Sequence, residues 1–217
     1  MILSLTEIIQ QLIVDVKNTK LLEYVAVLAG IISVWYSKKE HVWLYPFGLV
    51  NTTVFIYLSY TSGLFGEATV NLYYTIMSVI GWQMWRKKDN LSNTAILKIS
   101  FASIKEWKQH FIFFGCFYII LYAVLHYLKV NFAKNTIPWA DAFASATAFT
   151  GMWLMNKKKV ESWYWWIATN VASIPLYFVK HYVFTSVYYV VLLIMAFYGL
   201  AAWAKKANHL QNQINNT

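Results

Sequence analysis

Residues 183–203 read VFTSVYYVVLLIMAFYGLAAW, a stretch that contains no charged side chain. The core of a bilayer is about 30 Å thick and requires about 20 mostly apolar residues in a helix, so this stretch is long enough to cross it. The whole chain shares this character, since 59% of its 217 residues are apolar and only 12% are charged. An ordinary soluble domain carries about 25% charged residues. The sequence therefore predicts an integral membrane protein.

Six more stretches pass the same test, and short polar clusters such as the one at residues 37–40 separate them. The chain is therefore predicted to be an all-α membrane protein with seven transmembrane helices. The predicted spans cover residues 21–37, 43–60, 68–85, 109–128, 138–155, 163–180 and 183–203.

Residues 1–20 precede the first span and have a different pattern. Apolar side chains recur there at helical spacing opposite polar ones such as Gln10 and Gln11, which predicts an amphipathic helix lying on the membrane surface. Glu7 and Asp15 are not typical of a signal peptide, so we expect this segment to stay on the mature protein.

The positions of the cations predict the orientation. Most of the 18 Lys and Arg residues lie in the loops after the first, third and fifth spans and in the C-terminal tail. Cytoplasmic loops hold the excess of Lys and Arg, so the C-terminus is predicted to face the cytoplasm and the N-terminus the outside. This asymmetry accounts for the net charge of +9, and no nucleic-acid partner is predicted.

The first and last three spans share landmarks in the same order. Each set shows a Trp, a Lys-rich cluster, a second Trp, an Asn, a pair of Tyr, a Gly and a final Trp. In the first three spans these are Trp35, Lys38, Lys39, Trp43, Asn51, Tyr73, Tyr74, Gly81 and Trp85. In the last three they are Trp153, Lys157, Lys158, Lys159, Trp163, Asn170, Tyr188, Tyr189, Gly199 and Trp203. This order predicts two parallel three-helix repeats, residues 21–85 and 138–204, joined by a basic loop and linking helix at 86–137 and followed by a tail at 205–217. Carriers built this way hold their substrate near the midplane, although a duplication without transport stays open.

Three asparagines, Asn51, Asn71 and Asn170, lie inside predicted spans. An unpaired carboxamide in hydrocarbon is costly, so each needs a partner. Hydrogen bonds between helices, worth about 0.6 to 2 kcal/mol each, are the plainer interpretation. Because Asn51 and Asn170 follow corresponding landmarks, we expect them to share a central site.

Trp163, Trp166 and Asn170 fall on one helical face at steps of three and four residues. Two indole rings above a carboxamide would bind a flat, hydrogen-bonding ring, and a cationic ring most strongly. The alternative is an aromatic belt at the membrane interface.

Four tyrosines complete the candidate site: Tyr73 and Tyr74 lie within one turn of Asn71, and Tyr188 and Tyr189 are their predicted counterparts. Buried hydroxyls need partners, so these groups either orient a substrate or tie helices together.

Pro175 interrupts the sixth span one turn after Asn170 and is a candidate hinge, since proline frees a backbone carbonyl. Asp141 is a candidate gating residue or cation site, because acids inside membranes are usually functional, but it is also placed to cap a helix. Glu67 lies at the end of a span, where we expect water.

No phosphate-binding loop, metal-spaced His or Cys cluster or Ser-His-Asp arrangement occurs in the sequence, so we predict neither an enzyme nor a cofactor or metal. A retinal protein is excluded because residues 183–203 contain no lysine for a Schiff base.

The pattern resembles the PnuC family of bacterial vitamin transporters, relatives in fold of the SWEET sugar facilitators, from about Tyr24 to Lys205. The motifs that carry the resemblance are PFGLVN at residues 46–51, GWQMW at 81–85 and VESW at 160–163, leading into Trp166 and Asn170.

This resemblance implies a 3+1+3 helix arrangement and a central site in which aromatic side chains clamp the substrate ring while asparagines bind its polar edge. It implies facilitated diffusion of nicotinamide riboside, thiamine or riboflavin through the bacterial inner membrane, with a cytoplasmic vitamin kinase trapping the product. Trp163, Trp166, Asn170 and Asn51 carry over as site residues, whereas Asn71 stands where riboside carriers have a glutamine.

Nicotinamide riboside and thiamine both contain a cationic ring, which suits a Trp and Tyr site, whereas riboflavin is neutral and larger. An inside-negative potential favours uptake of either cation by about 2.3 kcal/mol per 100 mV, so no coupled ion is required. We therefore predict a carrier of nicotinamide riboside, with thiamine second. The alternative from another functional class is a membrane scaffold or receptor subunit, and a membrane enzyme is the third hypothesis. The sequence leaves open whether the chain forms a homo-oligomer.

Overall fold

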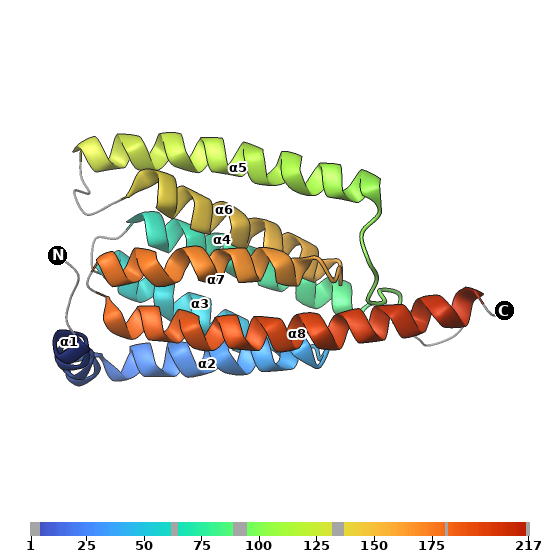
Figure 1. The fold of residues 1–217 in the computed structure, drawn as a ribbon, viewed down its shortest axis with the longest axis horizontal. Helices are drawn as coiled ribbons and strands as arrows, with labels where there is room; N and C mark the ends of the chain where they lie inside the picture. Colours follow the sequence, from blue (N-terminus) through green and yellow to red (C-terminus); the bar gives the residue numbers. More distant parts are fainter. Residues whose placement is uncertain (1–4, 62–64, 89–94, 132–136, 181, 216–217) are drawn as a thin grey trace.

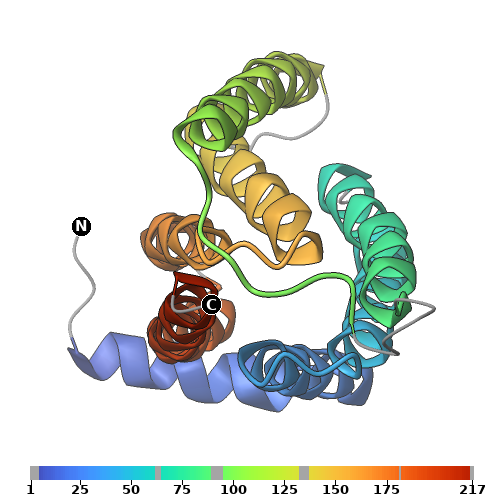
Figure 2. The same cartoon turned by 90° about the vertical axis from the view of Figure 1, so that its right-hand side faces the viewer.

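The computed structural model describes residues 5–61, 65–88, 95–131, 137–180 and 182–215. Within these ranges the regular elements are eight α-helices (Figure 1): α1 (Leu5–Asn18), α2 (Leu21–Lys38), α3 (Leu44–Thr61), α4 (Phe65–Arg86), α5 (Ile104–Asn131), α6 (Pro138–Asn156), α7 (Ser162–Val179) and α8 (Val183–Asn215). Helices α2 to α8 run side by side as an elongated bundle, while α1 lies across one end of it (Figure 1, Figure 2).

The all-α membrane character predicted from the sequence is confirmed. Among the described residues, three helices are long and apolar enough to cross a bilayer on their own composition, those at Leu21–Lys38, Ile104–Val130 and Val183–Gln213. Helices α2 to α8 cover the seven predicted stretches to within one residue at either end. Two helices are much longer than predicted, because α5 and α8 continue into polar sequence that hydropathy does not mark as a span.

Local sequence signals explain several helix ends. Pro138 occupies the first turn of α6, where its missing N–H costs little. At the start of α5, the Ser103 N–H donates to Glu106 Oε2 (2.8 Å) and the Glu106 N–H donates to Ser103 Oγ (3.3 Å), which is a capping box. Helix α8 runs 12 residues past Trp203 to Asn215 because no Gly or Pro interrupts it.

The triplets α2–α4 and α6–α8 correspond at a constant shift of 118 residues, the separation of Glu40 and Lys158. Helices α3 and α7 both contain 18 residues and start at corresponding positions. Glu40 and Lys158 follow the first helix of their triplets and both adopt a left-handed backbone, with φ of 56° and 53°. The backbones of the two triplets therefore match in helix positions and in the left-handed residue that follows the first helix.

Ring packing repeats at the same shift. The Tyr45 and Trp85 rings meet edge to face at 5.4 Å and 87°, and the Trp163 and Trp203 rings meet at 5.6 Å and 88°. Trp163 therefore corresponds to Tyr45, whereas the sequence pattern had aligned it with Trp43. Aromatic residues are so frequent here that a neighbouring ring can imitate the true counterpart.

The same shift corrects two further alignments. Asn170 corresponds to Thr52, so Asn51 is displaced from it by one position, and Tyr189 corresponds to Asn71. One residue is about 100° around a helix, so Asn51 and Asn170 do not occupy equivalent positions of the two triplets.

The two triplets meet through equivalent contacts, since α4 packs against α6 and α2 packs against α8. Helix α5 packs on α6 at the edge of the bundle (Figure 2). The segment before α5 crosses one end of the bundle, where the Ser100 N–H donates to Lys158 O (3.2 Å) and the Val160 N–H donates to Ser100 O (3.1 Å).

The glycine at position 199 provides a test of this packing. A Cβ at Gly199 would overlap the Trp163 ring, whereas one at Gly115 would meet nothing within 4 Å. We expect Gly199→Ala to lower the free energy of unfolding by about 1–3 kcal/mol, the usual cost of overpacking. Gly115→Ala is the matched control and should be neutral or stabilising, because alanine is the better helix former. Thermal unfolding in detergent measures both, and equal midpoints for the two variants would contradict this packing.

Candidate substrate-binding site

Trp166 of α7 lies where α4, α6 and α7 come together. A Cβ built at Gly151 of α6 would be 3.2 Å from Cδ2 and Cε2 of the Trp166 ring, so the indole lies directly on the α6 backbone. The Tyr74 ring of α4 lies 6.3 Å from the Trp166 ring. Since α4 belongs to one triplet and α6 and α7 to the other, the indole lies at the interface between them.

Phe149 of α6 organises the aromatic side chains that surround Trp166. Its ring stacks on Tyr73 at 3.9 Å and meets Tyr74 edge to face at 5.9 Å. The Tyr73 hydroxyl donates to Phe149 O at 3.2 Å. Both tyrosines of α4 therefore contact the second triplet, and only Tyr74 lies against the indole.

Asn170 lies one turn after Trp166 on the same face of α7, and its side chain is 3% exposed. Within the described ranges its carboxamide has no hydrogen-bond partner. The neighbouring Thr169 is satisfied, since its hydroxyl bonds Thr147 Oγ1 (3.0 Å) and Trp165 O (2.9 Å). Because no described protein group bonds it, the Asn170 carboxamide is available to a ligand that supplies both a donor and an acceptor.

Asn51 of α3 lies at the other interface between the triplets, where its amide is already used. Nδ2 donates to Ala26 O of α2 at 2.7 Å, and the Tyr188 hydroxyl of α8 lies beside it over the same glycine of α2, Gly30. A Cβ at Gly30 would lie 2.8 Å from Asn51 Nδ2, so this glycine makes room for the contact. Asn51 and Tyr188 therefore tie α2, α3 and α8 together.

Asn71 and Tyr189 also have protein partners. Asn71 Nδ2 donates to Glu67 O of its own helix at 2.9 Å. The Tyr189 ring stacks on Tyr177 of α7 at 5.2 Å and 15°. Tyr189 therefore packs against the neighbouring helix, while Asn71 bonds within α4.

Trp163 is 1% exposed and packs in the core against Gly199 and Trp203 of α8. Trp166 packs against Gly151 of α6 instead. Although the two rings share a face of α7 in sequence, they therefore contact different helices.

Asp141 and Lys180 form an ion pair at one end of the bundle. Lys180 Nζ lies 2.5 Å from Asp141 Oδ1, and the Ile137 N–H donates to Asp141 Oδ2 at 2.8 Å, which caps α6. Glu67, expected in water, is partly buried and interacts electrostatically with Lys180. Pro175 lies within α7, which continues to Val179.

At the opposite end, polar side chains join the triplets. Asn156 is 1% exposed, accepts from the Tyr45 hydroxyl on Oδ1 (3.0 Å) and donates from Nδ2 to Met77 O (2.8 Å). Its own carbonyl accepts from Trp85 Nε1 at 3.1 Å.

The equivalent Trp203 Nε1 donates to Ser37 O at 3.0 Å, so each triplet's closing tryptophan bonds the last turn of the other triplet's first helix. Glu40 adds ion pairs to Lys158 (2.7 Å) and Lys206. These bonds cross between the triplets at the end that holds the basic clusters.

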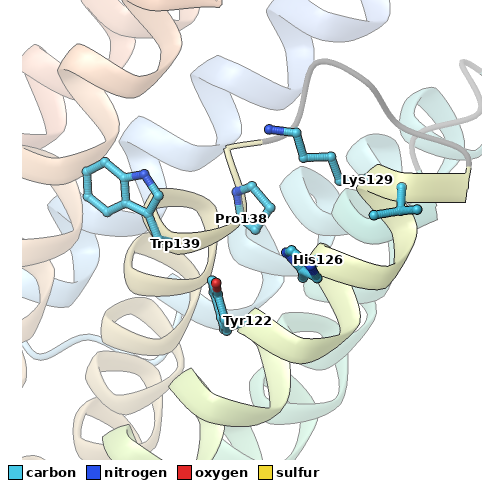
Figure 3. A pocket seen from close by; sticks show the side chains of 6 residues that line it. Tyr122, His126, Lys129, Pro138 and Trp139 are labelled. Atoms are coloured by element: carbon cyan, nitrogen blue, oxygen red, sulfur yellow. The ribbon is translucent and has the colours of Figure 1, made fainter.

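Two cavities lie outside this region. One of about 370 Å³ lies between α5 and the start of α6 and is lined by residues that include Tyr122, His126 and Trp139 (Figure 3). Another of about 650 Å³ lies between residues 98–106 and the end of α8. Neither is lined by a residue of the predicted site.

The family model described as nicotinamide mononucleotide transporter matches residues 20–205. The chain belongs to this transporter family. The resemblance to the PnuC family is confirmed by relatives of that name. A nicotinamide riboside transporter PnuC of Neisseria mucosa is 27% identical over 191 residues, which is 83% of this chain and 71% of the relative.

Other members of the family agree. The nicotinamide riboside transporter PnuC of Escherichia coli is 22% identical over 86% of each chain. A riboflavin/roseoflavin transporter, RibM of Streptomyces davaonensis, is 20% identical over 81% of each. A crystal structure of the vitamin B3 transporter PnuC superposes with a TM-score of 0.69 at 25% identity, covering 93% of this chain and 88% of that one.

The sequence did not predict that Phe149 and Gly151 belong to the candidate site. Phe149 is one of 14 phenylalanines and Gly151 one of eight glycines in a mostly apolar chain. No local pattern separates them from their neighbours, because their roles depend on contacts between helices.

Proposed function

We propose that this chain carries nicotinamide riboside across the bacterial inner membrane by facilitated diffusion, with the vitamin bound at Trp166 and Asn170. The observation that carries the proposal is the carboxamide of Asn170, a residue 3% exposed, which bonds no described protein group and lies one turn from an indole at the interface between the triplets. The names of the relatives support the same substrate class. The chain is accordingly a transporter and not an enzyme.

The ligand's chemistry fits this pair of residues. Nicotinamide carries a carboxamide, whose donor and acceptor complement those of Asn170 in a paired hydrogen bond. The alkylated ring is cationic and is attracted to the electron-rich face of Trp166. Tyr74 lies on the α4 side of the indole and is placed to border the same ring.

The charge of the surrounding helices favours the riboside over its phosphate ester. Helices α6 and α7 contain no Lys or Arg, and the single cation of α4 is Arg86, its last residue. Lys180, at the end of α7, is already paired with Asp141. A phosphate dianion buried there without a cation would be strongly unfavourable, so the mononucleotide is a poor substrate.

The proposal includes a topology of seven spans, α2 to α8, arranged as 3+1+3 with α5 as the linking helix. The constant shift of 118 residues between the triplets supports two parallel repeats. The loop cations support a cytoplasmic C-terminus and an external N-terminus, with α1 on the outer membrane surface. Rocking of one triplet against the other at the α4–α6 and α2–α8 contacts would alternate access.

Riboflavin is the second candidate, because RibM is named for it. Thiamine, the other cationic vitamin, is the third. Once inside, a riboside would be phosphorylated by a cytoplasmic kinase, and the charged product could not return through the same site. Association of identical chains is compatible with this scheme.

A competition experiment tests the substrate. Purified protein in detergent binds radiolabelled nicotinamide riboside, and unlabelled riboside, its mononucleotide, thiamine and riboflavin compete in turn. We expect the riboside to compete at the lowest concentration and the mononucleotide at least tenfold less effectively. Stronger competition by riboflavin or thiamine would reassign the substrate, and failure of all four to bind folded protein would overturn the proposed function.

A further inference from the structure

The two triplets differ at one helix crossing next to the candidate site. In the second triplet, Gly151 of α6 faces Trp166 of α7. The shift of 118 residues maps these two positions to Ser33 of α2 and Gly48 of α3. A Cβ at Gly48 would lie 3.3 Å from Ser33 Oγ, so the same crossing is formed there with the glycine on the other helix.

The second triplet therefore has an indole, Trp166, at the position where the first triplet has a glycine, Gly48. The Trp166 ring fits only because α6 offers bare backbone at Gly151. A Cβ there would be 3.2 Å from two ring carbons and 3.4 Å from Nε1, which is closer than ordinary van der Waals contact. Because a planar ring cannot yield locally, the whole indole would have to move away from α6.

The indole also has a neighbour in the first triplet. The Tyr74 ring of α4 lies 6.3 Å from the Trp166 ring. Phe149 holds Tyr73 by a stack at 3.9 Å and contacts Tyr74, so this side is itself constrained. A small displacement of the indole would therefore change the space between Trp166 and the first triplet.

Glycine is a poor helix former, and α6 carries Gly151 in its interior. Alanine would favour the helix itself, so the packing of Trp166 is the physical reason for glycine at this position.

We propose that Gly151 is a positioning residue: it sets how far the Trp166 indole projects from α6 and thereby determines which ring fits against it. This inference rests on the proposed function, because it concerns the same ligand site. Its consequence is that affinity and ring-size selectivity depend on a residue that need not touch the ligand.

The test compares Gly151→Ala with Gly48→Ala, the same substitution at the equivalent crossing. At Gly48 the new Cβ would meet the ends of hydroxyl side chains, 3.3 Å from Ser33 Oγ and 3.6 Å from Ser78 Oγ, which can shift slightly. We expect Gly151→Ala to weaken binding of nicotinamide riboside at least fivefold, with riboflavin weakened further, and to lower the thermal midpoint less than Gly199→Ala does, because its Cβ would meet the ring at 3.2 Å and not 2.4 Å. Gly48→Ala should change either affinity less than twofold.

Repeating Gly151→Ala in a Trp166→Phe background identifies the cause. A smaller ring leaves room for the Cβ, so the substitution should change the affinity of that background less than twofold. Gly151→Ala alone could fail to fold, and the double variant Gly151→Ala with Trp166→Phe then decides. A folded double variant with the affinity of Trp166→Phe supports the proposal. A double variant that does not fold overturns it. Equal losses in the wild-type and Trp166→Phe backgrounds, equal losses for the two glycine positions, or unchanged binding by Gly151→Ala would also overturn it. Absence of binding by wild-type protein would instead refute the proposed function.

Discussion

Alanine at position 166 or at position 170 is expected to weaken nicotinamide riboside binding at least tenfold, equivalent to about 1.4 kcal/mol. Trp166→Ala removes the ring face that attracts the cationic vitamin. Asn170→Ala removes the carboxamide of a buried residue that bonds no described protein group, so the ligand loses its paired hydrogen bonds while the described part of the protein loses none. Equilibrium binding of the labelled riboside measures both effects.

Tyr164→Ala is the control on the same helix, since this side chain is 47% exposed. It should bind the riboside like wild type. The site assignment fails if Trp166→Ala and Asn170→Ala are folded and bind the vitamin as tightly as Tyr164→Ala does.

The second large effect is expected on the free energy of unfolding, when Asn156 is replaced by alanine. Asn156→Ala removes the groups that pair with the Tyr45 hydroxyl and with Met77 O, and leaves both without those bonds in the core. Each buried polar group left unpaired costs about 1–3 kcal/mol, so a loss of roughly 2–4 kcal/mol in unfolding free energy is expected. Thermal denaturation in detergent reports this as a lower midpoint.

The matched control is Asn71→Ala, because Asn71 Nδ2 bonds only the preceding turn of its own helix. Its effect on the midpoint should be less than half that of Asn156→Ala. Equal destabilisation by the two alanines would show that the bonds between the triplets contribute no special stability.

Hydropathy predicted the positions of helices α2 to α8 well, because a bilayer requires long apolar helices and the polar clusters mark their ends. It could not predict the polar extensions of α5 and α8, which helix propensity and capping produce instead. The recurring landmarks of the two triplets were visible in the sequence, but the shift of 118 residues between corresponding helices was not. A chain with 11 Trp and 16 Tyr offers several alignments that differ by a few residues, and only the backbone distinguishes them.

The candidate site was predictable where one helix face carries it, as for Trp166 and Asn170. Spacing within α7 could not separate Trp163 from Trp166, because the rings pack on different neighbouring helices. Asp141 was predictable as a cap, but its partner Lys180 lies 39 residues away. Such contacts between helices are absent from any local pattern.

Counterflow in liposomes tests the central claim that the chain is a vitamin carrier working through Trp166. Vesicles containing the protein are loaded with unlabelled nicotinamide riboside and diluted into a trace of the labelled vitamin. The account predicts transient accumulation of label inside vesicles with wild-type protein, and much slower accumulation with Trp166→Ala. Accumulation no greater than in protein-free vesicles, with folded wild-type protein that binds the riboside, would contradict it and favour a receptor or scaffold.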